Sequence, residues 1–371
     1  MFIDEFLSLV NVHMKRSTPF LLMNENILMS KIKEFEKILD KFDVYYAVKA
    51  NPDKAVISRI AKSGLGFEIA SESELDLLLN LGISSKRIIS SNPIKTPQFL
   101  DRLVQAGISR FVFDSYDELE KISSKLSNAK VILRLAVDNT QSAWPLDEKY
   151  GVSVSDANAF LLKAKTLGLD PIGITFHVGS QCIGNEAWQS ALQEVYTVWE
   201  NAASEGIMLT YLNMGGGFPA SHGDIVPSVS ETFDYILSIL KNTFPPSIEL
   251  AIEPGRGLVG DAGVLVTSII GRAIREENEW IYLDVGVFNG LMESIGGIEY
   301  SYLVTNKTTQ GELKSFTIAG PSCDSFDVVS KSVILESPMI GDRLMIFPAG
   351  AYTTSYASNF NGMTIPEVVM I

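Results

Sequence analysis

The sequence predicts an α/β protein that begins with a TIM-type (β/α)8 barrel and ends with an antiparallel β-sandwich or β-barrel domain. From about residue 25 to 262, short apolar runs alternate with longer amphipathic stretches, roughly every 20–40 residues, which is the rhythm of repeated βα units. After about residue 262, apolar runs follow one another without long helices between them. No G-x-G-x-x-G sequence opens the first unit, which favours a closed barrel over an open dinucleotide-binding sheet.

The expected elements follow from these runs. Barrel strands are expected at 44–48, 66–70, 87–90, 110–113, 131–135, 172–176, 211–214 and 248–252. A helix is expected from Ser71 to Leu81, because Ser71 and Glu74 have capping-box spacing. Strands of the second domain are expected at 264–270, 280–283, 314–318 and 343–347. The barrel is therefore expected to span 25–262, and the β domain to combine 1–24 with 263–371.

Composition narrows the class of protein. The 371 residues carry 44 acidic and 30 basic side chains, a net charge of −14, which disfavours binding to nucleic acid. No apolar run is long enough for a membrane helix, and residues 1–5 are acidic where a signal peptide is basic, so a cytoplasmic protein without membrane contact is expected. Two cysteines, Cys182 and Cys323, and three histidines without a C-x-x-C pair predict neither a disulfide framework nor a metal site.

Several reactive side chains follow the expected barrel strands, where barrel enzymes place their active sites. Lys49 ends the first strand and is either a solvated strand terminus or an amine that bonds covalently to a carbonyl compound. His177 and Ser180 follow the sixth strand, and Glu253 and Arg256 follow the eighth. The acid and the arginine could form a local ion pair or hold two ends of one ligand.

Glycine-rich and turn-like segments complete the set. Gly215, Gly216 and Gly217 follow the seventh strand and form either a tight turn or a cradle of backbone N–H groups for an anion. In the second domain, residues 320–327 and 350–352 are turn-like segments that carry reactive side chains.

Six segments occur together in the order and spacing of one family: YAVKAN at 46–51, FHVGS at 176–180, GGG at 215–217, EPGR at 253–256, GPSCD at 320–324 and GAY at 350–352. The chain resembles the pyridoxal-phosphate-dependent decarboxylases with the alanine-racemase fold, which act on ornithine, lysine, arginine or diaminopimelate. The resemblance covers nearly the whole chain. It implies a decarboxylase that produces a diamine or polyamine, with pyridoxal phosphate as its cofactor.

The resemblance also implies a role for each matching residue. Lys49 would bond covalently to the cofactor, His177 would stack on its ring, and Glu253 would pair with the protonated ring nitrogen. Arg134, Glu68 and Gly255 would also lie at the cofactor; Glu68 stands where many members have an aspartate. The phosphate would be bound by Ser180, Gly215, Gly216, Gly217, Arg256 and Tyr352.

The resemblance implies a homodimer with shared active sites. Cys323 would return a proton to the substrate after carbon dioxide leaves, and Asp324 would bind the far end of the substrate, both from the other subunit. Tyr352 and Phe360 would also contact the substrate. Lys149 and Asp327 match a pair that bridges the subunits in relatives.

The sequence does not identify the substrate. Relatives that act on ornithine have an acid directly before the glycine corresponding to Gly286, whereas this chain has Val285 there and Asp284 one residue earlier. The leading hypothesis is a basic amino acid held by Asp324. The alternatives are a conjugated amino acid with a longer or non-cationic tail, and an inactive decarboxylase-like protein that binds a partner enzyme. An alanine racemase fits less well, because Cys323 and the acid partner of the ring nitrogen suit decarboxylation.

Overall fold

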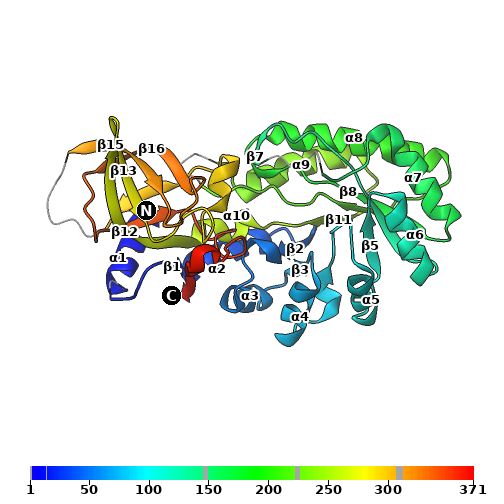
Figure 1. Ribbon diagram of the computed structural model, residues 1–371. Coiled ribbons are helices and arrows are strands. Elements are labelled where there is room, and N and C mark those ends of the chain that lie inside the picture. The colour runs from blue at the N-terminus through cyan, green and yellow to red at the C-terminus, as the bar shows by residue number, and fades with distance from the viewer. Residues whose placement is uncertain (1, 14, 145–148, 222–225, 306–311) are drawn as a thin grey trace. The chain divides into compact units, whose positions relative to one another are not determined.

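The computed structural model describes residues 2–13, 15–144, 149–221, 226–305 and 312–371. The chain divides into two compact units (Figure 1). The barrel unit comprises Ile32–Pro219 and Val226–Gly255, and the β unit comprises Met1–Lys31, Ala220–Ile225 and Arg256–Ile371.

The barrel unit is built on an eight-stranded sheet in the order β4-β3-β2-β11-β10-β8-β6-β5, in which every neighbouring pair is parallel. All eight predicted strands are present, with ends shifted by a few residues. Their bounds are β2 (Asp43–Ala47), β3 (Gly66–Glu68), β4 (Ile88–Ile89), β5 (Arg110–Phe113), β6 (Lys130–Arg134), β8 (Asp170–Thr175), β10 (Tyr211–Asn213) and β11 (Glu249–Ile252). The predicted barrel is confirmed.

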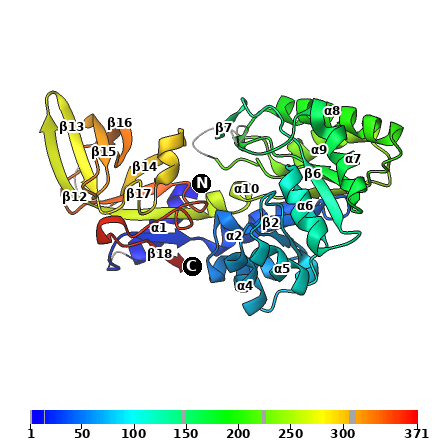
Figure 2. The same ribbon diagram turned by 45° about the vertical axis from the view of Figure 1, so that its right-hand side comes forward.

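Helices lie outside these strands, as Figure 2 shows. They are α3 (Lys54–Ala61), α4 (Glu72–Asn80), α5 (Pro97–Gln105), α6 (Tyr116–Lys125), α7 (Val154–Thr166), α8 (Asn185–Ser204) and α9 (Val229–Thr243), with α2 (Glu25–Glu36) crossing the boundary of the units. A small hairpin pairs β7 (Ser142–Trp144) with β9 (Ser180–Cys182). Ser71 caps α4 by accepting a hydrogen bond from the N–H of Glu74, as the sequence predicts.

Side chains from five neighbouring strands of the barrel sheet, β5, β6, β8, β10 and β11, pack against one another. Val112, Ile132, Ile172, Tyr211 and Ala251 form one buried cluster. A core packed in this way leaves the ends of the strands as the place for polar chemistry.

A buried lysine joins the two edge strands of the barrel sheet, β4 and β5. The Lys95 side chain is fully buried, and its Nζ donates hydrogen bonds to the carbonyl oxygens of Asn92, after β4, at 2.9 Å and of Val112, in β5, at 2.7 Å. The buried carboxylate of Glu118 lies 2.9 Å from the same Nζ. Burial lowers the pKa of Lys95, and Glu118 opposes that change.

The β unit is a mixed sheet and not a purely antiparallel one. Its main order is β14-β17-β12-β13-β15-β16, where β13 and β15 are parallel, and β1 joins β12 to β18. The bounds are β1 (Phe20–Met23), β12 (Gly263–Arg275), β13 (Asn278–Leu283), β14 (Ser301–Val304), β15 (Leu313–Ala319), β16 (Val328–Glu336), β17 (Arg343–Phe347) and β18 (Glu367–Met370). The helical segments are α1 (Phe2–Val12), α10 (Arg256–Val259), and the 3-10 turns η3 (Gly260–Ala262), η4 (Met292–Gly296) and η5 (Phe360–Gly362).

Across the described residues, no helix has the length and apolar character needed to span a membrane.

Candidate active site

Lys49 lies directly after β2, within the 3-10 turn η1 (Val48–Ala50). The buried hydroxyl of Tyr46 donates a hydrogen bond of 3.0 Å to the carbonyl oxygen of Asn51 and so fixes the chain on both sides of the lysine. The Lys49 side chain is 47% exposed, and its Nζ lies 3.7 Å from an oxygen of the buried Glu68 on the adjacent strand β3. The structure therefore presents a primary amine beside a buried acid at the strand ends.

Glu253 follows β11 and is buried. Its Oε1 accepts hydrogen bonds from the hydroxyl of Ser91, which follows β4, and from Nδ2 of Asn213, the last residue of β10, at 2.5 Å. Burial raises the pKa of Glu253 to about 7; the charge of Glu68 raises it further, while Ser91, Lys49 and Asn213 lower it. Burial thus favours the protonated form of Glu253, and the groups that donate hydrogen bonds to it oppose this effect.

Sequence reasoning did not single out Ser91 or Asn213. Ser91 is 162 residues from Glu253 and Asn213 is 40 residues away, so no local spacing connects them. The available signal was a polar side chain at the end of an apolar strand, which Asn213 shows in the run Tyr211–Asn213.

His177 is held in one tautomer by its own loop. Its Nδ1 accepts a hydrogen bond of 3.0 Å from the N–H of Gly179, which places the ring hydrogen of the neutral form on Nε2. Burial lowers the pKa of His177 well below its usual range, and the charges of Lys49 and Arg134 add to this effect. The ring is therefore neutral at physiological pH.

Gly215 and Gly216 pack tightly against this histidine, and Gly217 packs against Val178 and Gly179. A Cβ on Gly216 would lie 2.8 Å from the carbonyl oxygen of Glu253 and 2.9 Å from Nε2 of His177. Gly215 and Gly217 have φ angles of +64° and +119°, which other residues rarely adopt. These positions require glycine, and together they leave bare backbone beside His177.

Three other predicted residues of the barrel unit lie in separate surroundings. The guanidinium of Arg134 lies 5.1 Å from the ring centre of Tyr150, and the charge of Glu253 acts on it. Ser180 opens β9 and is paired with Trp144 of β7. Gly255 is buried at the end of the barrel unit.

In the β unit, Arg256 already has an acidic partner. Its guanidinium donates two hydrogen bonds to Glu293 of η4, one of them 2.9 Å long, and both side chains are buried. The ring of Tyr352 lies 4.9 Å from the guanidinium carbon. Burial alone would lower the pKa of Arg256. The charge of Glu293 and its hydrogen bonds outweigh burial, so the pKa of Arg256 is raised. Sequence reasoning missed Glu293, and its separation of 37 residues from Arg256 gives no local signal.

Cys323 and Asp324 lie in an exposed turn between β15 and β16. The N–H of Cys323 donates a hydrogen bond of 3.0 Å to Oδ1 of Asn361, and Oδ1 of Asp324 accepts one of 2.8 Å from the N–H of Phe326. Phe360 is 41% exposed, and its ring lies 4.7 Å from that of Phe288. The turn is thus fixed by its backbone while the thiol remains accessible.

Asp327 and the residues before Gly286 are engaged inside the β unit. Both carboxylate oxygens of Asp327 accept backbone hydrogen bonds, from Val287 at 2.7 Å and from Ser322 at 2.9 Å. Asp284 accepts hydrogen bonds from Thr18, Thr267 and Ser268. Val285 is fully buried, so it does not line an open substrate space within its own unit.

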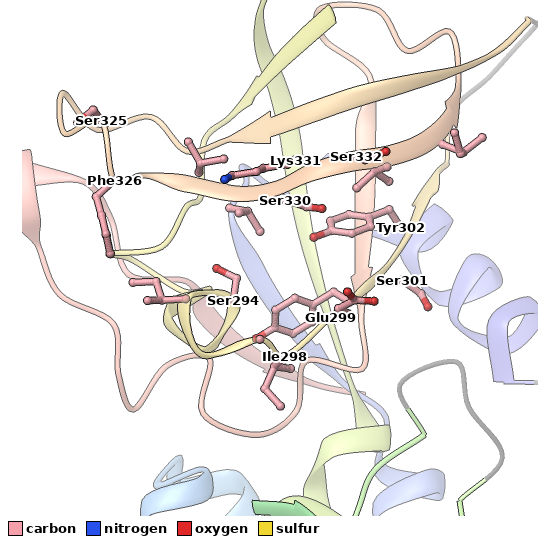
Figure 3. A pocket seen from close by; sticks show the side chains of 17 residues that line it. Ser294, Ile298, Glu299, Ser301, Tyr302, Ser325, Phe326, Ser330, Lys331 and Ser332 are labelled. Carbon is pink, nitrogen blue, oxygen red and sulfur yellow. The ribbon is translucent and has the colours of Figure 1, made fainter. Parts of the chain in front are cut away.

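A pocket of about 900 Å³ lies in the β unit between η4, β14 and β16. Its lining is rich in hydroxyl groups and includes one carboxylate, Glu299, and one ammonium, Lys331; both are labelled in Figure 3 beside Tyr302. Ser325 and Phe326, which follow Asp324 in the sequence, also line it. None of the predicted site residues is part of this lining.

Comparison with known proteins decides the family. The family model described as "Pyridoxal-dependent decarboxylase, pyridoxal binding domain" matches residues 25–260. The chain belongs to the pyridoxal-dependent decarboxylases. The lysine/ornithine decarboxylase of Selenomonas ruminantium is 32% identical over 356 residues, which are 95% of this chain and 89% of that protein.

Two further matches show the breadth of the pyridoxal-dependent decarboxylase family. Antizyme inhibitor 2 of Xenopus laevis is 31% identical over 90% of this chain and 77% of its own length. The crystal structure of the Paramecium bursaria Chlorella virus arginine decarboxylase bound to agmatine superposes with a TM-score of 0.91 at 28% identity and covers 98% of this chain and 100% of that one. The family model and the decarboxylases among these relatives confirm the predicted family, fold and enzyme class, which is that of the pyridoxal-phosphate-dependent amino-acid decarboxylases.

The residues of the barrel unit fit pyridoxal phosphate. The amine of Lys49 lies next to Glu68, and the glycine segment packs on His177 so closely that no side chain could be added at Gly216. Within the described part of the chain, Oε2 of the buried Glu253 accepts no hydrogen bond, so it remains able to accept one from a ring nitrogen.

Proposed function

We propose that Lys49 bonds covalently to pyridoxal phosphate and that the site around it removes the α-carboxylate of a basic amino acid. The observation that carries this proposal is the arrangement of the Lys49 amine, the neutral His177 and the buried acid Glu253 at the strand ends of one unit. When bound, pyridoxal phosphate supplies a conjugated ring that takes up the electron pair left as carbon dioxide departs.

The barrel unit binds and orients the cofactor. Glu253 keeps the ring nitrogen protonated, and the neutral ring of His177 stacks on the cofactor without placing a second positive charge beside Lys49. The N–H groups of Gly216 and Gly217 and the hydroxyl of Ser180 bind the phosphate, beside the backbone of Gly215, whose own N–H is donated to Asn213. Glu68 holds the Lys49 ammonium close by, and Arg134 positions the ring.

Arg256 and Tyr352 of the β unit complete the phosphate site. Because Glu293 holds the guanidinium through two hydrogen bonds, Arg256 is fixed in place and has its charge partly compensated before any phosphate binds. Arg256 therefore contributes a fixed and partly compensated positive charge, while the backbone of Gly216 and Gly217 supplies neutral N–H donors.

The thiol of Cys323 delivers the proton that replaces the carboxylate, and Asp324 binds the distal ammonium of the substrate. Both side chains are exposed in an isolated copy, and the neighbouring Phe326 is 59% exposed and Ile295 43% exposed. We infer that a second copy of the chain covers this face, so that the active unit is a homodimer with composite sites. A reduced thiol at Cys323 also favours a cytoplasmic location.

Mixing two inactive variants tests the composite site. Lys49→Ala and Cys323→Ala subunits should together recover about a quarter of the wild-type activity, because half of randomly paired dimers are mixed and each mixed dimer has one intact site of two. The shared-site proposal is wrong if subunit exchange is demonstrated and no activity returns.

A conjugated amino acid is the second candidate substrate. The large polar pocket lined by Glu299, Tyr302 and Lys331 favours it, because a longer polar tail would find both an acid and a base there. An inactive binding protein is the third candidate, and the presence of both Lys49 and Cys323 argues against it.

The test is a carbon dioxide release screen of the cofactor-loaded protein with ornithine, lysine, arginine, diaminopimelate and carboxynorspermidine. Lys49→Ala serves as the blank. Preferred release from one of the first three identifies a basic amino acid, and preferred release from carboxynorspermidine identifies the conjugated class. Absence of release from all five, with bound cofactor, would contradict the decarboxylase function.

A further inference from the structure

Glu253 is held by two side chains that the roles above leave unused. The hydroxyl of Ser91 and the amide Nδ2 of Asn213 both donate hydrogen bonds to its Oε1, and they come from different strands, β4 and β10. Ser91 and Asn213 are buried, at 8% and 1% exposure, so water does not compete effectively for these bonds. We call Ser91 and Asn213 the Glu253 clamp.

The geometry of the clamp is one-sided. Because both donors meet Oε1, the carboxylate is fixed in rotation, while Oε2 accepts no hydrogen bond from the described residues. A carboxylate fixed in this way presents one defined acceptor to a ring nitrogen. Each donor also favours the ionised form over the protonated one.

The groups around Glu253 have opposing effects on its ionisation, so the two donors of the clamp matter. Several charged and titratable groups on the surrounding strands act on Glu253. They are Glu68, Lys49, Arg134, Tyr45 and Tyr211. His177 lies over the adjacent Gly216. Burial and the nearby Glu68 favour the neutral acid, whereas Lys49 and Arg134 favour the carboxylate. His177 is neutral and adds no charge. The clamp therefore adds to the groups that favour the ionised form of Glu253, against burial and Glu68, which favour the protonated form.

Asn213 also connects this acid to the glycine segment. Its Oδ1 accepts a hydrogen bond of 2.9 Å from the N–H of Gly215, while the N–H of Glu253 donates one of 2.7 Å to the carbonyl oxygen of Gly215. One amide side chain thus joins the acid for the ring nitrogen to the backbone proposed to bind the phosphate.

We propose that Ser91 and Asn213 are positioning residues that keep Glu253 ionised and fixed toward the ring nitrogen of the cofactor, and that Asn213 sets its distance from the phosphate-binding glycines. The inference rests on the proposed function, since it assigns a support to the acid named there. It predicts that the proton shared between Glu253 and the ring nitrogen moves to Glu253 when the clamp is weakened, because a carboxylate without donors is the stronger base.

The chain offers a matched control for Ser91. Ser90 is the preceding residue and also buried, at 3% exposure, and its hydroxyl has no hydrogen-bond partner among the residues that the structure describes. Ser91→Ala and Ser90→Ala thus remove the same atom from adjacent buried positions, and only the first weakens the clamp. Ser91→Thr retains the hydroxyl. Asn213→Asp retains the acceptor for Gly215 and replaces the amide donor to Glu253 by a second carboxyl group, which disfavours the ionised form of Glu253.

The experiment measures the ¹⁵N chemical shift of the ring nitrogen in proteins loaded with ¹⁵N-labelled pyridoxal phosphate, together with kcat and KM at saturating cofactor. Wild type, Ser90→Ala and Ser91→Thr should show a protonated ring nitrogen. Ser91→Ala and Asn213→Asp should shift the signal toward the unprotonated value and lower kcat about 10–100-fold, the loss expected for one hydrogen bond to a charged group.

The outcomes separate this inference from the function beneath it. A Ser91→Ala spectrum identical to that of Ser90→Ala, with cofactor bound in both, would overturn the clamp and leave the decarboxylase proposal intact. A wild-type protein that fails to bind the labelled cofactor through Lys49 would instead overturn the proposed function, and the clamp with it.

Discussion

Replacing Lys95 by methionine should destabilise the barrel unit strongly although Lys95 touches no substrate. The ammonium is fully buried and bonds to two backbone carbonyls and to the carboxylate of Glu118. Methionine fills a similar volume but donates nothing. The variant therefore leaves the carbonyl oxygens of Asn92 and Val112 unpaired in the region where β4 and β5, the edge strands of the sheet, are joined by this side chain.

The size of the stability loss depends on the partners that Glu118 keeps in the variant. Glu118 keeps the ammonium of Lys121, whose side chain is 24% exposed, and the backbone N–H of residue 95, so its charge is not left alone. Removing one member of a buried ion pair typically costs ~3–5 kcal/mol, and the remaining partner places this case near ~3 kcal/mol. Replacing both Lys95 and Glu118 by apolar residues should recover part of the loss, because no buried charge then lacks compensation.

Urea unfolding monitored by tryptophan fluorescence measures this loss. The matched control is Lys125→Met, since the Lys125 side chain is 27% exposed and pairs with the half-exposed Asp101 on the surface. That change should cost under ~1 kcal/mol. If Lys95→Met loses no more stability than Lys125→Met, the structural role of the buried lysine is wrong.

Three further predictions concern the site. Burial raises the pKa of Glu253 from 4.5 to about 7, so the folded apoprotein retains a proton that the unfolded chain releases. The free energy of unfolding should therefore fall by about 3 kcal/mol as the pH rises from below 4.5 to above 7. Glu253→Gln should remove this contribution to the pH dependence of stability, measured by thermal melts at several pH values. Gly216→Ala should weaken cofactor binding at least about tenfold by equilibrium dialysis, because its Cβ meets backbone at 2.8 Å, whereas Gly271→Ala, with ordinary contacts from 3.5 Å, should not. Asp324→Asn should lower kcat/KM for a cationic substrate about 10–100-fold and leave the cofactor spectrum unchanged; unaltered turnover of every cationic substrate would place the distal group elsewhere.

Much of the barrel was predictable because its strands are buried on both faces. Strands such as β5 (Arg110–Phe113) and β10 (Tyr211–Asn213) have short apolar runs with a polar residue only at one end, so hydrophobicity and spacing locate them directly. The amine and acid at Lys49 and Glu253 were also predictable, because strand ends of a barrel meet at one rim. The structure brings Lys49 to Glu68 and Glu253 to Ser91 within one unit.

The β unit was less predictable because its pairing is not local. The short strand β1 (Phe20–Met23) pairs with β12 and with β18 (Glu367–Met370) at the other end of the chain, and neither β1 nor β18 was expected. β16 was also missed, because its outer residues are exposed and its pattern mixes serine and lysine with valine. The pair of Arg256 and Glu293 follows the same rule: tertiary contacts between distant segments leave no spacing in the sequence.

The most direct test of the account is the identity of the lysine that bonds to pyridoxal phosphate. The loaded protein is reduced with borohydride, digested, and the labelled peptide is mapped by mass spectrometry. The label should lie on Lys49, should be absent from Lys49→Ala, and should be unchanged in Lys54→Ala, which alters an exposed lysine five residues further along the chain. Label on another lysine of the wild-type protein, or undiminished labelling of Lys49→Ala, would contradict the site described here.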